Sequence, residues 1–314
     1  MRSFAVLMLA AASAAGMAAA TGANAQDLLA SNFSSSTITR FDLNTRQLKA
    51  THGPGSGLSA PLASRVGPDG RLYVTSEGSD AILRYNPNTG AFIDTFIAPG
   101  SGGLTQPTGL DWGPDGNLYV ASFNGNKVLR YHAGTGAFLS TFVTAGLGSL
   151  NGADNGMIFG PDGNLYIPSY NNGRVLKYNG TTGAFVSIFA TVGLPRVILF
   201  RANDVLITSE TVGVRRHNKT TGAFLSTFAS SGVNGLITAI GMAAGPDGSI
   251  YVSSGNNRIL KYSGVNGAFQ QTFASGSPGL SLPTFLTVIV PTPGAAAPLA
   301  LAAAFALRRK RTEG

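Results

Sequence analysis

The chain has 314 residues, no cysteine, 11% charged residues and a formal net charge of +8 at pH 7. Arg2 and residues 308–314 contribute four of these positive charges, which leaves about +4 on the rest of the chain. So weak a balance argues against nucleic-acid binding, which needs a concentrated basic surface. The lack of cysteine excludes disulfides, so the fold must be stabilised by a hydrophobic core.

Residues 1–25 have the pattern of a secretory signal peptide. Arg2 precedes an apolar stretch from Phe4 to Met8, and Ala23 and Ala25 place small residues just before Gln26. A charged start, an apolar middle and small residues at the cleavage site are typical of such signals. The alternative is a buried helix. The sequence therefore predicts an exported protein.

After this segment the sequence repeats, and the clearest mark of the repeat is Gly-Pro-Asp-Gly. It occurs at residues 67–70, 113–116, 160–163 and 245–248, so its starts are 46, 47 and 85 residues apart. Fixed periods of 40 to 50 residues indicate a repeat architecture. Proline, aspartate and glycine favour tight turns, so each Asp is expected to shape a hairpin. A functional Asp at these turns is the alternative.

Each copy contains the signals of four short strands. In one copy these are Thr108–Trp112 before the glycine turn, then Leu118–Ser122, Val128–Tyr131 and, after Thr-Gly-Ala-Phe, Phe138–Phe142. Such apolar runs between turn residues are typical of strands. Four strands in about 45 residues make one β-propeller blade.

Two blurred copies complete the count. Residues 200–224 form a copy without Gly-Pro-Asp-Gly, and Leu28–Phe41 match the second and third strands of a further copy. The first strand that this N-terminal copy lacks is matched by Pro283–Val288. The sequence therefore predicts an all-β fold over residues 26–290, a six-bladed β-propeller of four-stranded blades. Its ring is closed by pairing the C-terminal strand with the N-terminal blade, which removes exposed sheet edges.

Over residues 27–290 these copies resemble NHL-repeat and SMP-30/gluconolactonase-like propellers, a superfamily that includes the streptogramin lyases. The resemblance implies a ligand-binding face made by the loops between second and third strands and the loops between blades. For a lyase it implies a channel histidine, and for a lactonase a metal cluster of Glu, Asn and Asp that starts on an early strand. His52, His132 and His217 lie off the predicted channel strands, and Leu28–Ser31 contains no Glu.

The loops of that face contain the candidate ligands. Glu77 and Glu210 follow second strands, and Asp154 and Asn155 end a long connection between blades. Carboxylates and amides that converge on a channel suit a hard cation such as Ca²⁺. The alternative is that the Asn- and Gly-rich loops only form turns. No catalytic residue is assigned, because the chain has no Cys, no paired His and no nucleophile motif.

The copy without Gly-Pro-Asp-Gly is the main break in the symmetry of the ring. Arg196, Arg201 and Glu210 surround it. A partner recognised asymmetrically is expected there, which makes Arg196 a further ligand-binding candidate.

Two sets of charges recur in register. Arg65 and Asp111 occupy one place in adjacent first strands, where other copies have Ile158, Ile198 and Ala243. They predict an ion pair between blades, with two independent solvated charges as the alternative. A basic residue also precedes the third-strand aromatic in every copy, for which a solvated or inter-blade structural role is expected. These residues are Arg40, Arg84, Arg130, Lys177, Arg216 and Lys261.

Residues 291–314 combine Pro291-Thr-Pro293, a short apolar stretch over 295–307 and a basic cluster at 308–311. As a helix the apolar stretch would span about 20 Å, less than the ~30 Å hydrocarbon core. This order resembles PEP-CTERM sorting signals, with Pro-Thr-Pro in place of Pro-Glu-Pro. The resemblance implies transient membrane anchoring, an exosortase-type processing enzyme as partner, and the cell envelope or surface of a Gram-negative-type bacterium. A disordered Ala-rich tail is the alternative.

The leading functional hypothesis is an exported, surface-sorted propeller that acts as a non-catalytic binding or scaffold module. Its ligand would be a protein or a carbohydrate. The alternative is a metal-dependent hydrolase or lyase of the gluconolactonase/streptogramin-lyase type.

Overall fold

A computed structural model describes residues 26–53, 55–276 and 279–289. The predicted signal peptide and the predicted sorting signal lie outside these residues. Within them, no helix is long and apolar enough to cross a membrane.

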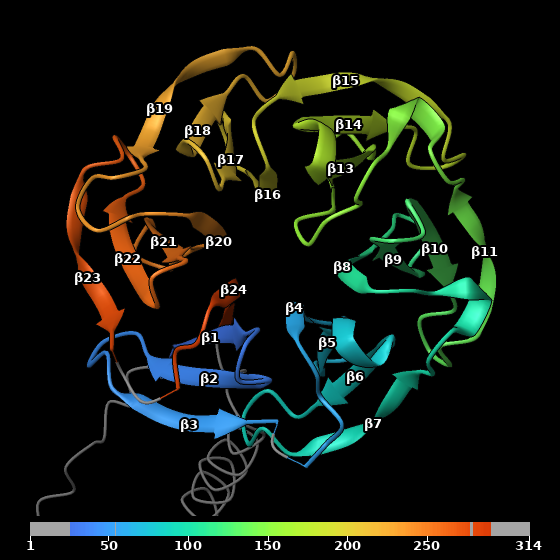
Figure 1. Ribbon diagram of the computed structural model, residues 1–314, viewed down its shortest axis with the longest axis horizontal. Coiled ribbons are helices and arrows are strands. Elements are labelled where there is room, and N and C mark those ends of the chain that lie inside the picture. The colour runs from blue at the N-terminus through green and yellow to red at the C-terminus, as the bar shows by residue number, and fades with distance from the viewer. Residues whose placement is uncertain (1–25, 54, 277–278, 290–314) are drawn as a thin grey trace, which may run out of the picture.

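The chain forms six four-stranded antiparallel sheets arranged as blades around a central channel (Figure 1). The first three blades contain β24 (Pro283–Ile289), β1 (Asp27–Asn32), β2 (Thr37–Asp42) and β3 (Leu48–His52); β4 (Pro61–Val66), β5 (Leu72–Ser76), β6 (Ala81–Tyr85) and β7 (Phe92–Ile97); and β8 (Pro107–Trp112), β9 (Leu118–Ser122), β10 (Lys127–Tyr131) and β11 (Phe138–Val143). The other three contain β12 (Ile158–Phe159), β13 (Leu165–Ser169), β14 (Arg174–Tyr178) and β15 (Phe185–Thr191); β16 (Pro195–Phe200), β17 (Val205–Ser209), β18 (Gly213–His217) and β19 (Phe224–Ser230); and β20 (Ala239–Ala244), β21 (Ser249–Ser254), β22 (Arg258–Ser263) and β23 (Phe269–Ser275). Short 3₁₀ turns occur at η1 (Glu77–Ser79), η2 (Ser101–Gly103), η3 (Leu147–Ser149) and η4 (Tyr170–Asn172).

The ring closes as the sequence predicted. Strand β24, from the end of the described chain, pairs antiparallel with β1 at its start, with Leu28 opposite Val288 and Ala30 opposite Leu286. All four side chains are buried or half-buried, so closure both satisfies the edge of β1 and completes a core cluster. The prediction of an all-β, six-bladed propeller is confirmed.

The Gly-Pro-Asp-Gly turns have a geometric role. In the first of them the amide of Gly70 donates to the carbonyl of Gly67 (2.9 Å), and Gly70 has φ = 77°, a conformation that favours glycine. A Cβ on Gly67 would lie 2.6 Å from a ring carbon of Tyr73, so that glycine is required by packing. Asp69 accepts the amide of Arg71 (3.1 Å), which fixes the hairpin.

The same aspartates also bind the recurring basic residues. Lys177 lies 2.8 Å from Asp162, and the hydroxyl of Tyr166 donates to the same carboxylate (3.0 Å). Turn, second strand and third strand of one blade are thus tied at one carboxylate. The other Gly-Pro-Asp-Gly turns give the pairs Arg84–Asp69, Arg130–Asp115 and Lys261–Asp247. In the two blades without this turn, Arg40 pairs with Asp27 of β1 and Arg216 pairs with Asp204.

The expected solvated or inter-blade role of these basic residues is therefore wrong in its main point, since each of them pairs within its own blade. Arg40 alone among them also reaches the next blade, where it donates to the carbonyl of Asn88. In the blade that lost Gly-Pro-Asp-Gly, Asp204 takes over the turn's role and accepts from both Arg201 and Arg216. The lost turn is thus replaced without loss of the ion pair.

Candidate functional site

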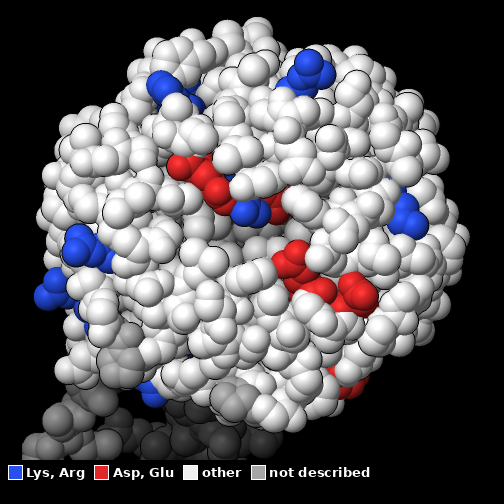
Figure 2. Space-filling model, in the orientation of Figure 1, with Lys and Arg blue, Asp and Glu red and all other residues white. Residues whose placement is uncertain are grey.

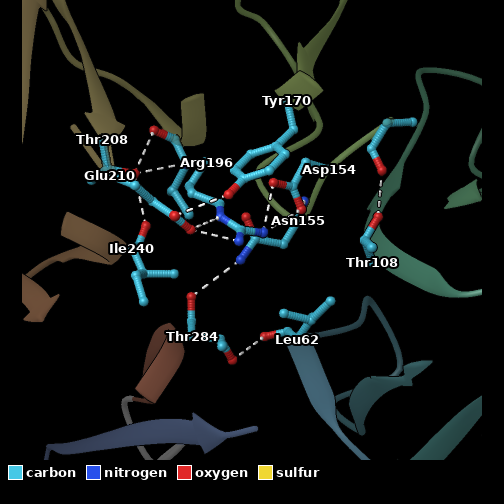
Figure 3. A network of polar contacts seen from close by, with 12 residues as sticks. Leu62, Thr108, Asp154, Asn155, Tyr170, Arg196, Thr208, Glu210, Ile240 and Thr284 are labelled. Atoms are coloured by element: carbon cyan, nitrogen blue, oxygen red, sulfur yellow. Dashed lines mark hydrogen bonds and ion pairs between the residues drawn. The ribbon is translucent and has the colours of Figure 1, made fainter. Parts of the chain in front are cut away.

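The innermost strands provide one side chain each to the upper mouth of the channel, on the face shown in Figures 1 and 2. All of these strands except the two-residue β12 have a register irregularity just after their first residue, as between Pro61 and Ser64 or between Pro195 and Ile198. The second residue thereby leaves the ladder and lines the channel. The resulting inner ring consists of Leu62, Thr108, Asp154, Arg196, Ile240 and Thr284, all labelled in Figure 3.

A second ring lies at the rim. It is formed by the residue that follows each second strand, which is where that strand turns back toward the third. The rim ring consists of Phe33, Glu77, Phe123, Tyr170, Glu210 and Gly255. All of these except Tyr170 line, together with the inner ring, one cavity of 410 Å³. Figure 2 shows acidic side chains around the central hollow, with basic atoms between them, on a face that is otherwise mostly uncharged.

Asp154 reaches the channel because its strand is interrupted. Strand β12 is reduced to two residues, and before it Asp154 donates its amide to the carbonyl of Pro168 (3.1 Å) and accepts the amide of Met157 (3.2 Å). Gly156 then makes a bridge to Val197 of the next blade. This turn leaves the carboxylate of Asp154 fully buried at the axis.

Arg196 joins the two predicted carboxylates (Figure 3). Its Nη1 lies 2.8 Å from Oδ2 and 3.1 Å from Oδ1 of Asp154, and its Nε donates to Oε1 of Glu210 (2.6 Å). The guanidinium carbon lies 4.2 Å from the centroid of the Tyr170 ring, and the hydroxyl of Tyr170 donates to Oε2 of Glu210 (2.9 Å). Charge-assisted bonds and a stacked ring hold the arginine rigidly.

Glu77 faces the same cavity but stands outside this network. Among the described residues, its carboxylate has no hydrogen-bond or ion-pair partner. Burial and the negative charge of Asp154 raise the pKa of Glu77, while Arg196 lowers it. Burial likewise raises the pKa of Asp154 to about 6, against the opposing effect of Arg196. The main cause of both shifts is burial, which disfavours the charged form of a carboxylate.

Asn155, the remaining ligand candidate, lies beside this cavity and does not line it. It is fully buried, and its Nδ2 donates to the carbonyl of Thr284 across the channel (3.2 Å) while its amide donates to Asp154 (2.7 Å). Asn155 therefore helps to hold Asp154 in place. The structure thus brings Glu77, Asp154, Glu210 and Arg196 to one cavity, with Asn155 behind them.

The geometry offers little support for a calcium site at these residues. Arg196 lies between Asp154 and Glu210, where its guanidinium already supplies the positive charge. In the described part of the chain, no group of three or more His, Cys, Asp or Glu side chains could hold a metal ion. Calcium binding stays a prediction that titration with the ion can check.

Other predicted features lie away from the upper mouth. His132 is exposed, while His52 and His217 are buried outside the cavity, and Nδ1 of His217 is bonded to the carbonyl of Gly222 (2.9 Å). Arg201 follows the opposite end of β16 from Arg196 and pairs with Asp204, so of the three charged residues beside the worn copy only Arg196 and Glu210 lie at the upper mouth.

Arg65 and Asp111 form no direct ion pair in the described structure, so that prediction is wrong. Instead, Oδ2 of Asp111 accepts the amide of Phe159 from the next blade (2.8 Å), and Arg65 lies over the ring of Phe285.

The register also corrects the alignment of the fifth blade. Leu199 pairs with Leu206 as Arg65 pairs with Tyr73, so Leu199 and not Ile198 is the counterpart of Arg65.

Sequence reasoning missed Phe33, Phe123 and Tyr170 of the rim ring. A signal for them was present, since each follows the last residue of a second strand, as Glu77 and Glu210 do. Aligning that single position in all copies would have found the whole ring. The inner ring can be found in the same way. Its members are the residues that come after the Pro or Ala at the start of each first strand, and in the interrupted blade Ala153 corresponds to that Pro or Ala.

Comparisons with known proteins identify the fold. No protein-family model matches the chain, and no curated protein matches its sequence. A protein of unknown function from Bacteroides caccae is similar in structure, with a TM-score of 0.68, 14% identity, and coverage of 85% of this chain and 100% of that one. A chain of a nidogen/laminin complex has a TM-score of 0.65, 15% identity, and coverage of 84% and 98%. A streptogramin B lyase has a TM-score of 0.58, 15% identity, and coverage of 82% of both chains. At such identities the likeness establishes the propeller fold and no activity.

Proposed function

We propose that this protein is an exported, surface-sorted propeller that acts as a non-catalytic binding module. Its upper mouth would receive a cationic group of a protein or carbohydrate partner. The observation that carries this proposal is Glu77, whose carboxylate faces the cavity without a hydrogen-bond or ion-pair partner among the described residues. A half-buried carboxylate without a counterion gains from a bound ammonium or guanidinium.

The charge of the mouth favours the same class of ligand. Three carboxylates, those of Glu77, Asp154 and Glu210, face one guanidinium, so the cavity has an excess of negative charge. Enclosed walls focus this field and raise the local concentration of cations. Phe33 and Phe123 add aromatic surface to the lining, which suits the apolar stem or the charge of a basic group.

The alternative, a metal-dependent hydrolase or lyase, has weaker support. It depends on likeness to the fold of a streptogramin B lyase at 15% identity. The described lining of the mouth contains no histidine, and its arginine is committed to two carboxylates and a tyrosine ring. These residues suit holding a ligand better than moving a proton during a reaction.

Export and sorting complete the proposal. Residues 1–25 would direct secretion, and residues 291–314 would anchor the chain until an exosortase-type enzyme processes it at the envelope. Mass spectrometry of protein recovered from the native envelope checks both ends. A mature chain that starts at Gln26 and ends before the basic cluster supports this route, whereas an intact chain contradicts it.

Binding at the mouth can be tested with matched probes. Calorimetry with the full-length protein would compare N-acetyl-Gly-Lys-Gly-amide with N-acetyl-Gly-norleucine-Gly-amide, and glucosamine with N-acetylglucosamine. We expect the charged member of at least one pair to bind. Glu77→Gln should weaken that binding about tenfold or more, because a charge-assisted bond in a shielded site is lost. Asp94→Asn removes a carboxylate of the outer strand β7 that binds Arg84 away from the cavity, and it should leave probe binding unchanged.

Acidity gives a second readout. Because its pKa is raised, Glu77 takes up a proton at a higher pH than an ordinary glutamate does. Asp154 of the same cavity, with a pKa of about 6, loses its charge as the pH drops from 7 toward 5. Binding of the cationic probe should therefore weaken on acidification. Equal binding of charged and neutral probes, or binding that Glu77→Gln leaves intact, would refute the proposal.

A further inference from the structure

The channel has a second mouth, on the face of the Gly-Pro-Asp-Gly turns. There the far ends of the innermost strands enclose a cavity of 360 Å³. It shares no lining residue with the upper mouth. Its walls are mostly apolar, and the only charged side chains in its lining are those of Arg65 and Asp111.

Among the described arginines, Arg65 alone combines a shielded Nε–H that has no partner with the lack of an ion pair. Its Nε–H is shielded from solvent and has no hydrogen-bond partner, and its guanidinium forms no ion pair within the described chain. The guanidinium carbon lies 5.5 Å from the centroid of the Phe285 ring, which holds the side chain at the cavity. A bound anion would give this guanidinium the counterion that it lacks within the described chain.

Asp111 does not act as the counterion of Arg65. Its Oδ2 accepts the amide of Phe159, a bond that joins two blades, and no direct contact with Arg65 forms. Burial raises the pKa of Asp111, and the positive charge of Arg65 and bonds from the amides of Phe159 and Trp112 lower it. The carboxylate is therefore engaged by backbone, while the donors of Arg65 remain available.

We propose that this lower mouth binds a carboxylate carried on an apolar body, with Arg65 as the anchor of the carboxylate. The planar fork of a guanidinium matches a carboxylate in two parallel hydrogen bonds. Trp112, Ile158, Leu199, Met242 and Phe285 would surround the apolar part. The volume suits a small ligand or one terminal side chain of a peptide. This site is independent of the cation site proposed for the upper mouth.

Asp111 would tune the affinity of the site. Its negative charge faces the same cavity, so it opposes a bound anion, and Arg65 of β4 is the only other charged group in the lining. Asp111→Asn removes that repulsion and leaves an amide oxygen that can still accept the amide of Phe159. This variant should bind the carboxylate more tightly than the native protein.

The test is calorimetry of the full-length protein with 3-phenylpropionate and with the blocked peptide N-acetyl-Ala-Ala-Phe, each against its uncharged amide. We expect saturable binding of at least one acid and none of its amide. Binding of the peptide alone identifies a polypeptide C-terminus as the ligand, and binding of the free acid identifies a small carboxylate. Arg65→Met should weaken binding at least about tenfold. Arg71→Met, on the same face outside the cavity, is the matched control.

The proposal does not depend on one variant. If Arg65→Met fails to fold, Arg65→Lys keeps the charge but loses the fork, and it should still weaken binding several-fold. The comparison of acid with amide needs no variant at all. Absence of binding by both acids, amides that bind as well as the acids, or a folded Arg65→Met that binds normally would each overturn the assignment of Arg65.

Discussion

Replacing Arg196 with methionine tests how the upper mouth is stabilised. The change keeps much of the apolar stem but leaves Asp154, which has no exposed surface, without its counterion. Glu210 loses the same partner, although the hydroxyl of Tyr170 still donates to it. Removing one partner of a buried ion pair costs about 3–5 kcal/mol, because the other charge stays buried and uncompensated.

We expect a loss near the lower end, about 3 kcal/mol at pH 7, because Asp154 can take up a proton. Its pKa is about 6 with the arginine present and would rise further without it. In a domain of this size, about 3 kcal/mol corresponds to a fall in Tm of about 6–12 °C. The variant binds more protons when folded than when unfolded, so its stability falls as the pH rises from about 4 to 7. The difference from the native protein should therefore shrink at pH 5.

Thermal melting and guanidinium unfolding at pH 5 and pH 7 measure these changes. Arg71→Met, which removes an exposed arginine paired at 3.4 Å with Asp69, should stay within about 0.5 kcal/mol. The double variant Arg196→Met/Asp154→Asn should recover most of the loss, because the fully buried charge of Asp154 is then absent and Glu210 keeps its bond from Tyr170. A loss at pH 7 below about 1 kcal/mol, or a double variant as unstable as the sum of its parts, would refute this reasoning.

Three further perturbations test the frame and the mouth. Asp162→Asn should cost about 1 kcal/mol at pH 7 after allowance for solvent screening. Burial raises the pKa of Asp162, but the bond from Lys177 and those of the turn bring it to about 2. This stability is therefore lost as the pH falls from about 4 to 2, and the melting curves of the two proteins should converge there. Deleting residues 283–314 removes β24 and exposes the edge of β1, so the product should lose its cooperative melting transition and aggregate. Deleting residues 291–314 should preserve the transition. Equal behaviour of the two truncated proteins would contradict the closure of the ring. Millimolar Ca²⁺ should leave the Tm unchanged, because Arg196 already compensates the carboxylates of the mouth, and a rise of several degrees would restore the calcium site.

Most strands and turns of the propeller could be predicted, because the residues that specify them act locally. Alternating apolar runs and glycine turns are visible within one copy, and each blade repeats them. Closure was also predictable, because the N-terminal copy lacks the one strand that Pro283–Val288 provides. The role of Asp69 and its counterparts was only half predicted. The turn is local, but its bond to a lysine or arginine of the third strand depends on how the hairpin folds back.

The residues of the candidate site could be predicted from the sequence, but the contacts between them could not. Glu77, Asp154, Glu210 and Arg196 were found because they interrupt a repeat or follow a strand, and they do share a cavity. No sequence pattern indicates that the guanidinium of Arg196, and not a metal ion, lies between the two carboxylates. That contact joins residues 42 positions apart on two blades, and its geometry is set by the interrupted strand before β12.

The amino-acid sequence by itself determined the strands, the turns, the number of blades and the closing pair, because periodicity and turn chemistry act over a few residues and repeat. Tertiary structure alone decided which charges are paired. Six strands converge on one axis, and small register shifts place Arg196 against Asp154 and Glu210 while they leave Glu77 and Arg65 without partners among the described residues. Pairing of charges depends on differences of a few ångströms between distant segments, and such differences are properties of the packed ring.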